Sequence, residues 1–592
     1  MKVKKHNHHT LLITNLIALT ALVFASIPVS AQTGAEGTPT PAPFNRLAAD
    51  SPVYLPLIFR PAPPDLVVGG FEITQATQNL SNTVSLVAGK STLVRVYVQT
   101  DGDVAIQGVH VSLSGTRNGS QLNGSPISAG PKSVTKSWSR GDLNTSFNFS
   151  LPSEWLLGTV TLQIRLDPNN AISEGSETNN LSTTVANFNN VPALDVKVVP
   201  IQYNDPRSGL TFPPAGSNYL APGLVRMYPI NSAAVTRREY ISWSQNLAID
   251  TNWQNLLSRI ATLKQTDNAP EARIYYGLVP LRDDSGNVWF RSGVAGIGYV
   301  GYRASVGLAD LSPYIDGSEI ANHEIGHNLG RSHAPCGVSG DPNFPYAGGL
   351  IGQFGLRVDL MQLFDPAIYA DIMGYCEPVW ISDYTYQALF NNQVAVGASP
   401  QTSQPVVPSL LVRAALLDDG TVQLEPAYAF TGRPDPLPAD SDYFLELVDE
   451  SGVPVASYPL LVMRAEEETF VFRSINTMVR LPDQPFTGLR ITEKGQLAAQ
   501  RSMSPVSQRA QAMPSLHMSV QGAVLDWGEA ATPAVVRYRQ DGEETWTTLA
   551  VDYLGGSIDL DPQALPPGIL HFEIILADQI GSALTLDWEN TR

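Results

Sequence analysis

An eleven-residue segment with three histidines places the strongest constraint on how this chain folds. His323, His327 and His333 are half of the six histidines that follow the first 31 residues. On an α-helix four residues turn about 400°, so His323 and His327 point the same way, one turn apart. Gly330 predicts the end of that helix, because a residue without a Cβ easily takes the left-handed conformation that reverses the chain. Such a reversal brings His333 back beside the first two rings.

Three converging imidazoles with one open position are typical of a catalytic zinc site, since a structural zinc site is closed by a fourth protein ligand. Glu324 follows the first ligand directly. It is too far round the helix to be a good third ligand, but it lies near a water at the metal. The alternative, a helix with three core histidines, is disfavoured because buried imidazoles without a metal need several hydrogen-bond partners. The segment therefore predicts Zn²⁺ bound by the three histidines, with Glu324 as general base.

This segment resembles the signature of the metzincin zinc endopeptidases, an extended form of the zinc-helix motif. The resemblance implies a methionine turn downstream, and residues 371–376 offer one, with Met373 as the hydrophobic floor of the metal site. It also implies that Tyr375 is an extra ligand or oxyanion donor, as in astacin-like and serralysin-like members. Ala334 and Pro335 follow the third histidine, where the subfamilies carry other residues, so the subfamily stays open.

The family also holds its substrate against an antiparallel edge strand, and residues 293–300 are the candidate. Gly296, Ile297 and Gly298 lie within it, where small residues let a second chain approach and pair by strand addition. Gly296, Gly298 and Gly301 also match the G-x-G-x-x-G pattern of dinucleotide-binding loops. That pattern requires a helix that starts within the glycines, and residues 302–307 show no helix start. We therefore interpret the segment as a substrate-binding strand.

The chain has two cysteines, and each follows a predicted site residue by three positions. Cys336 follows His333, and Cys376 follows Met373. If the methionine turn lies beneath the metal, as the resemblance implies, the two thiols come together in a disulfide that closes a loop of about 40 residues. Free thiols are disfavoured in an exported protein, and thiolate ligands are unnecessary beside three histidines.

The N-terminus has the pattern of a secretory signal peptide over residues 1–31. Three lysines precede an apolar run, and residues 29–31 have the small-x-small pattern of a signal-peptidase site. The run is short for a membrane span, so cleavage is favoured over anchoring, and no later segment resembles a transmembrane helix. We therefore expect a secreted protein, free outside the cell or attached to its surface. The formal charge of −18 argues against nucleic acid as a partner.

Periodicity and breaker residues divide the chain into several domains. The predicted divisions are a signal peptide at 1–31, a Pro-rich linker at 32–64, an Ig-like β-sandwich at 65–190, a zinc peptidase domain at 191–396, a linker at 397–405, a β-sandwich at 406–503 and a fibronectin type III-like or Ig-like β-sandwich at 504–592. An apolar stripe with helical spacing at 253–263, between strand-like segments, is the main sign of α-structure. The expected fold class is therefore multidomain, with a central α/β metzincin-like (zincin) domain between all-β sandwiches.

These observations predict a secreted zinc-dependent endopeptidase that acts on polypeptide or glycoprotein substrates. The flanking β-sandwiches carry no visible catalytic set and are assigned to binding a cell surface or the substrate. Two alternatives stay open: a non-catalytic surface adhesin with a vestigial zinc site, and a zinc hydrolase acting on glycopeptide or non-protein amide substrates. Structural Ca²⁺ also stays open, with Asp341, Asp359 and Asp365 as candidate ligands between the histidines and the methionine turn.

Overall fold

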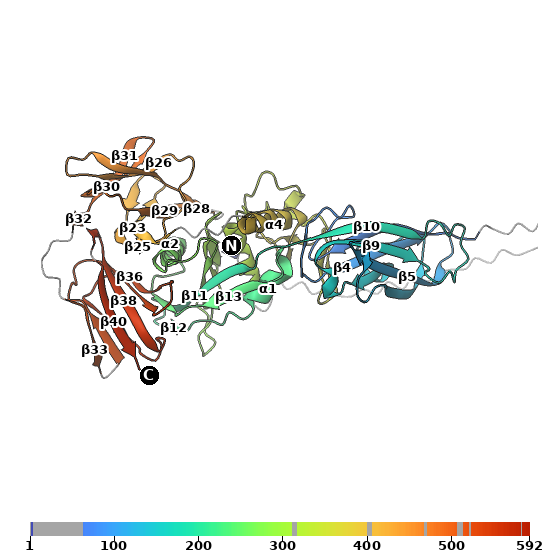
Figure 1. Cartoon of the computed structure of the whole chain (residues 1–592), viewed down its shortest axis with the longest axis horizontal. Coiled ribbons are helices and arrows are strands. Elements are labelled where there is room, and N and C mark those ends of the chain that lie inside the picture. The colour runs from blue at the N-terminus through green and yellow to red at the C-terminus, as the bar shows by residue number, and fades with distance from the viewer. Residues whose placement is uncertain are drawn as a thin grey trace, which may run out of the picture. The chain divides into compact units, whose positions relative to one another are not determined.

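The structure is a computed structural model that describes residues 2–3, 63–310, 317–398, 405–466, 471–505, 513–519, 522–581 and 583–591 (Figure 1). The predicted signal peptide and the first linker lie almost wholly outside the described residues, as does most of the second linker. No helix in the described ranges is both long enough and apolar enough to cross a bilayer.

The expected fold class is wrong in its central element. Strand accounts for 44% of the structure and helix for 12%, and the strands are spread over many small sheets, so this is a multidomain β-sandwich fold and not one built on a central α/β metzincin domain. The prediction gave too much weight to the stripe at 253–263. That stripe belongs to one long helix, α2 (Asp250–Thr266), whereas short strands and turns make up much of the surrounding chain.

The first described module is a β-sandwich, consistent with the Ig-type domain expected there. Its core includes Trp155, Leu162 and Val96, which side chains from both sheets surround. One sheet has the order β2 (Leu66–Thr74), β4 (Leu93–Thr100) and β8 (Ser146–Ser150); the other has β3 (Leu86–Val87), β10 (Leu181–Asn189), β9 (Gly158–Leu166), β5 (Ile106–Arg117) and β6 (Ser120–Gln121), with β7 (Ile127–Val134) beside β5.

A seven-stranded sheet follows, and it positions the histidine segment. Its order is β12 (Thr211–Phe212), β11 (Leu194–Asn204), β15 (Ile274–Val279), β18 (Ala304–Leu308) and β17 (Gly296–Gly298), with β13 (Ala233–Arg237) and β14 (Ile241–Trp243) also paired with β11. β11, β15 and β18 are parallel, and β17 pairs antiparallel with β18 at the end of the order.

Successive side chains of β15 point to opposite faces of this sheet and are buried on both, as expected for a strand covered on two sides. Tyr275 packs in a cluster with Ile260 of α2, whereas Tyr276 packs in another cluster with Leu224 and Ile325. These last two residues belong to α1 (Leu220–Met227) and α3 (Gly317–Asn328). Helix α4 (Asp383–Ala398) closes this part of the chain after the short pairs β19 (Gly355–Arg357) with β20 (Gln362–Phe364) and β21 (Ala370–Asp371) with β22 (Val379–Trp380).

Two further β-sandwiches complete the described chain, and the division of the chain into the predicted domains stays a prediction. The middle sandwich has one sheet of β24 (Val422–Leu424), β23 (Val407–Leu416), β29 (Val471–Arg480) and β28 (Met463–Glu466), with β25 (Tyr428–Gly432) beside β23, and another of β27 (Pro454–Pro459), β26 (Tyr443–Val448), β30 (Gly488–Glu493) and β31 (Gln496–Ser502). The last sandwich has sheets of β33 (Ser515–Ser519), β34 (Gly522–Asp526) and β37 (Ser557–Leu560), and of β36 (Thr547–Tyr553), β35 (Ala534–Gln540), β38 (Gly568–Leu576) and β40 (Leu584–Asn590).

Candidate metal centre

The three histidines of the motif converge on one point. His327 Nε2 lies 3.2 Å from His323 Nε2 and 3.2 Å from His333 Nε2. All three side chains are buried, with exposures of 1–2%. Among the described residues, this is the group of His, Cys, Asp and Glu side chains close enough to share one metal ion, with the ligand atoms all within 4.8 Å of one another. The donor set therefore fits a zinc ion bound by three imidazole nitrogens.

Backbone carbonyls fix the tautomers of two of these rings. His323 Nδ1 lies 2.7 Å from the carbonyl oxygen of Ile372, and His327 Nδ1 lies 2.6 Å from that of Arg331. Because a carbonyl oxygen only accepts, each Nδ1 carries the proton and donates it, which leaves the Nε2 lone pair directed at the common point. Burial lowers the pKa of His327 to about 4 and holds the pKa of His323 and of His333 well below the usual value. At neutral pH the rings are thus in the neutral form that binds a metal.

Gly330 lies at the predicted reversal. It follows the end of α3 with a φ of +84°, the left-handed conformation that favours glycine. Its N–H donates to the carbonyl of His327 at 2.8 Å, and the N–H of Arg331 donates to that of Gly326 at 3.0 Å. These two bonds satisfy carbonyls of the last turn of the helix and turn the chain toward His333. In the sequence, Asp316 followed by Glu319 three positions later has the pattern of an N-cap and predicts the start of this helix, and Asp316 lies outside the described residues.

The predicted methionine turn packs against the zinc helix. Met373 is buried, and a Cβ built on Gly326 would lie 2.4 Å from its Sδ, so the sulfur touches the helix backbone directly. The carbonyl of Met373 accepts from the N–H of Ala334 at 3.0 Å. The turn therefore contacts both the helix and the chain that follows His333.

A buried aspartate that sequence reasoning missed shapes this turn. Asp371 Oδ1 accepts from the N–H of Met373 at 2.8 Å, and Oδ2 accepts from the N–H of Ser382 at 2.9 Å. The carboxyl is fully buried, and burial raises its pKa against these hydrogen bonds. The sequence signal for this role was a single carboxylate within the apolar stretch from Ala370 to Met373. A charged group buried in such a stretch requires hydrogen-bond donors of its own.

Tyr375 lies beside the metal ligands. Its ring centroid is 4.9 Å from that of His333 and 5.7 Å from that of His323. The tyrosine is partly exposed, unlike the histidines. Its position is compatible with the role in holding an oxyanion that the resemblance implies, and that role stays a prediction.

Glu324 packs against the candidate edge strand. Its side chain is 1% exposed. A Cβ built on Gly296 would lie 2.6 Å from Glu324 Oε1, and one built on Gly298 would lie 3.3 Å from Glu324 Oε2. The carboxylate therefore packs against the backbone of β17, and only glycine leaves room for it there. Ile297, between the two glycines, pairs with Val306 of β18.

The edge beside β17 also accepts an added strand. β16 (Gly293–Val294) pairs antiparallel with β1 (Lys2–Val3), in a separate two-stranded sheet. β1 belongs to the predicted signal peptide, so cleavage after residue 31 would expose the backbone of β16 to a second extended segment. The candidate segment at 293–300 thus comprises two short strands rather than one continuous strand.

The predicted disulfide is confirmed. Cys336 and Cys376 are bonded, with their Cα atoms 5.6 Å apart and a sequence separation of 40. The N–H of Tyr375 also donates to the carbonyl of Cys336 at 2.8 Å. The bond therefore joins the chain after the third histidine to the chain after the methionine turn.

We expect replacement of both cysteines by serine to lower the melting temperature of this part of the chain by about 10 °C. A closed loop of this length contributes about 3–4 kcal/mol in the chain-entropy account, and 1 kcal/mol corresponds to about 2–4 °C in a domain of this size. Differential scanning calorimetry of Cys336→Ser/Cys376→Ser against the wild type measures the difference. An unchanged transition would show that the bond contributes nothing to stability.

The three candidate calcium ligands lie apart in different local contacts. Asp341 accepts from Tyr384 Oη at 2.8 Å and pairs with Arg331 at 3.4 Å. Its N–H also donates to the carbonyl of His333 at 2.7 Å, so it supports the loop after the third ligand. Asp359 pairs with an arginine two residues before it, and Asp365 accepts from a backbone N–H two residues after it. Calcium binding by these residues stays an open prediction.

Comparison with known proteins assigns the chain to no family. No protein-family model matches it, and no curated protein matches it. The chain is similar to a CARDB domain from Pyrococcus furiosus that was solved in complex with di-metal ions, with 19% identity over 22% of this chain and 96% of that domain and a TM-score of 0.15. It is also similar to a β-glycosidase from Bacteroides vulgatus, with 9% identity over 88% of this chain and 79% of that enzyme and a TM-score of 0.14. At such scores these likenesses carry no functional argument, and the metzincin resemblance rests on the motifs alone.

Proposed function

We propose that this chain is a secreted zinc-dependent endopeptidase. The observation that carries the proposal is the convergence of three buried imidazole nitrogens beside a buried glutamate, which itself lies against an edge strand. A chain that only needed a stable core would have no use for three polar rings directed at one point. A buried glutamate on the same helix, directly after His323, supports hydrolysis over simple metal storage.

His323, His327 and His333 would hold the ion. When bound, zinc polarises the scissile carbonyl and lowers the pKa of a water to about 7. Glu324 would take a proton from the attacking water and pass it to the leaving amine. Tyr375, whose ring centroid lies 4.9 Å from that of His333, would donate to the developing oxyanion.

The strand edge formed by β16 and β17 is the feature that favours a polypeptide as the substrate. An extended peptide pairs with a strand through main-chain hydrogen bonds, which need no particular side chain and therefore suit many sequences. Because Glu324 packs against β17, a peptide lying along this edge passes next to the general base. Polypeptides and glycoproteins outside the cell are the substrate class that this arrangement and the predicted signal peptide favour.

Cleavage of a broad peptide library tests the proposal. We expect the purified chain to cleave peptides at internal bonds, to lose this activity with a zinc chelator and to regain it when zinc is returned. Mass spectrometry of the products identifies the bonds. Release of sugar without peptide cleavage, or no cleavage by zinc-loaded protein, would contradict the proposal.

Gly296→Ala is expected to lower kcat/KM for peptide cleavage by about tenfold or more without loss of zinc. The added Cβ would lie within 2.6 Å of Glu324 Oε1, so the carboxylate or the strand must move, and small displacements of reacting groups are costly. Gly216→Ala is the matched control, because a Cβ there meets nothing within 4 Å. Equal activity of the two variants would exclude a role for this close approach.

A further inference from the structure

The turn that joins β17 to β18 is held by the middle sandwich. Tyr299, the first residue of this turn, is fully buried, and its hydroxyl lies 2.8 Å from Ser474 Oγ of β29. Its ring stacks on Phe472 at a centroid distance of 6.2 Å. Tyr299 forms an antiparallel bridge with Ala465 of β28, and the next N–H along the chain donates to the carbonyl of Arg464 at 2.7 Å. Side-chain and main-chain bonds thus both fix the turn to this sandwich.

The other side of the same turn is bonded to the zinc helix. The N–H of Gly301 donates to the carbonyl of His327 at 2.8 Å. Asn328 Nδ2 donates to the carbonyls of Tyr299 at 3.1 Å and of Ala304 at 2.8 Å. Asn328 is 1% exposed, and its Oδ1 accepts from Ser305 Oγ at 2.7 Å. The turn therefore lies between the middle sandwich and the last residues of the helix that carries two of the histidines.

We infer that the middle sandwich positions the substrate edge against Glu324, with Tyr299 as the positioning residue. This inference rests on the proposed function of the metal site. β17 has three residues, pairs with β18 on one side and leads directly into Tyr299. A strand this short has few bonds of its own, so its position depends on what holds its ends. The middle sandwich then helps to position the substrate-binding edge and is not a separate binding module.

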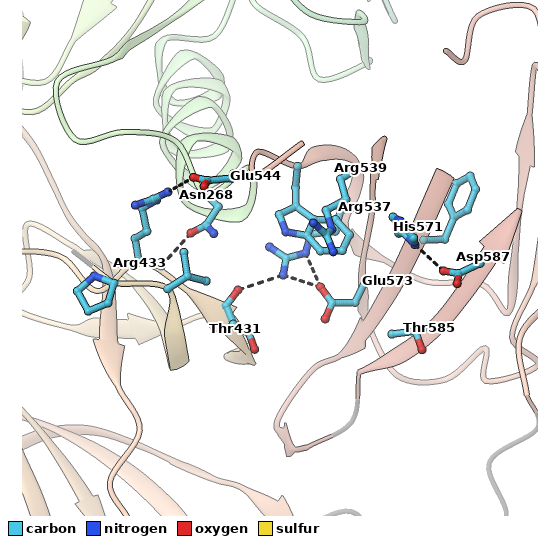
Figure 2. Close-up of a pocket in the computed structure, with 14 residues that line it drawn as sticks. Asn268, Thr431, Arg433, Arg537, Arg539, Glu544, His571, Glu573, Thr585 and Asp587 are labelled. Carbon is cyan, nitrogen blue, oxygen red and sulfur yellow. Dashed lines mark hydrogen bonds and ion pairs between the residues drawn. The ribbon is translucent and has the colours of Figure 1, made fainter. Parts of the chain in front are cut away.

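Contacts with α2 and the last sandwich keep the middle sandwich in place. Figure 2 shows Arg537 of β35 directed at Glu573 and Thr431, where its Nη2 donates to the carbonyl of Thr431 at 3.3 Å. Arg537 Nη1 also donates to the carbonyl of Thr266 at the end of α2, at 2.7 Å. The guanidinium is fully buried between the rings of Phe430 and Trp546, at 4.4 and 4.3 Å. One side chain thus joins all three elements.

The pocket in Figure 2 is therefore interpreted as a junction between the two sandwiches. Its charged groups are paired with one another, except Arg539, whose guanidinium lies over the ring of Trp546. Besides Arg537, Arg433 pairs with Glu544 at 3.3 Å, and His571 pairs with Asp587 at 2.7 Å. Because these groups bond to one another, we interpret the pocket as a structural contact and not as a ligand-binding site.

Ser474→Ala and Tyr299→Phe test the inference, because each removes one hydrogen bond and keeps the packing of the ring. We expect hydrogen exchange at residues 296–301 to become faster, with zinc content unchanged. We also expect kcat/KM for a long peptide to fall about tenfold, while that for a shortened version of the same peptide changes less than twofold. Tyr458→Phe is the matched control, since it removes a tyrosine hydroxyl bond of the middle sandwich that goes to the carbonyl of Arg480 within the same sandwich.

The outcomes separate the two proposals. Faster exchange at 296–301 in both test variants but not in Tyr458→Phe, with selective loss of long-peptide cleavage, supports the positioning role. Unchanged exchange, or an equal loss for both peptides in proportion to the folded fraction, overturns it. If the wild type cleaves no peptide, the proposed function fails, and hydrogen exchange alone still decides whether the sandwich holds the edge.

Discussion

Glu324→Gln is expected to lower kcat/KM for peptide cleavage by about 10²–10⁴-fold while the zinc content stays at one ion per chain. The amide has nearly the same shape as the carboxylate, so it fits against Gly296 and Gly298. It has no basic oxygen to accept a proton from water. The loss is therefore expected in kcat, with little change in KM. Steady-state kinetics on a cleaved library peptide, with zinc measured in the same samples, give both quantities.

Glu319→Gln provides the matched control. Glu319 lies in the first turn of the same helix, so the exchange changes the same chemical group without changing the residues proposed to act on substrate. We expect its activity and zinc content to match the wild type. Cleavage that survives in Glu324→Gln would reject Glu324 as the general base, even if zinc is bound as proposed.

His333→Ala is expected to weaken zinc binding by more than about 100-fold and to abolish cleavage. Loss of residues that merely support a ligand already costs 10–100-fold in affinity, and this change removes a ligand itself. His333 is the most suitable choice, because the Nδ1 atoms of His323 and His327 also bond to backbone carbonyls, and replacing either ring would remove that bond as well. Titration with zinc, followed by calorimetry, measures the affinity.

Thermal unfolding gives a second readout of the same change. Zinc at about 100 times its dissociation constant stabilises the wild type by about 2.7 kcal/mol, so its melting temperature is expected to rise with added zinc. His333→Ala is expected to show no such rise. His110→Ala, at an exposed position on β5, is expected to respond as the wild type does. A full zinc response in His333→Ala would exclude it as a ligand.

The candidate site was predictable from sequence where its geometry is local. His323 and His327 follow from the helical period, and Gly330 predicts a reversal whatever surrounds it. Met373 lies 46 residues beyond His327 in the printed sequence, and only the resemblance suggested it. The disulfide prediction depended on the same step.

The other features of the site and of the fold depend on contacts between distant residues, which no local sequence pattern encodes. Tyr299 and Ser474 are 175 residues apart, and nothing in either segment predicts their hydrogen bond. Asp371 and Asn328 are single polar residues whose partners appear only in the folded chain. The predicted fold class is wrong for a related reason: the helical stripe at 253–263 favours an α/β domain in the sequence, whereas strands dominate the structure.

Anomalous diffraction at the zinc absorption edge, from crystals of the zinc-loaded protein, tests the central claim most directly. The account predicts one strong peak within about 2.0–2.1 Å of Nε2 of His323, His327 and His333. The absence of a peak at these rings would contradict the account. So would a zinc ion whose fourth coordination position is filled by a protein side chain, because no position would then be open for water beside Glu324.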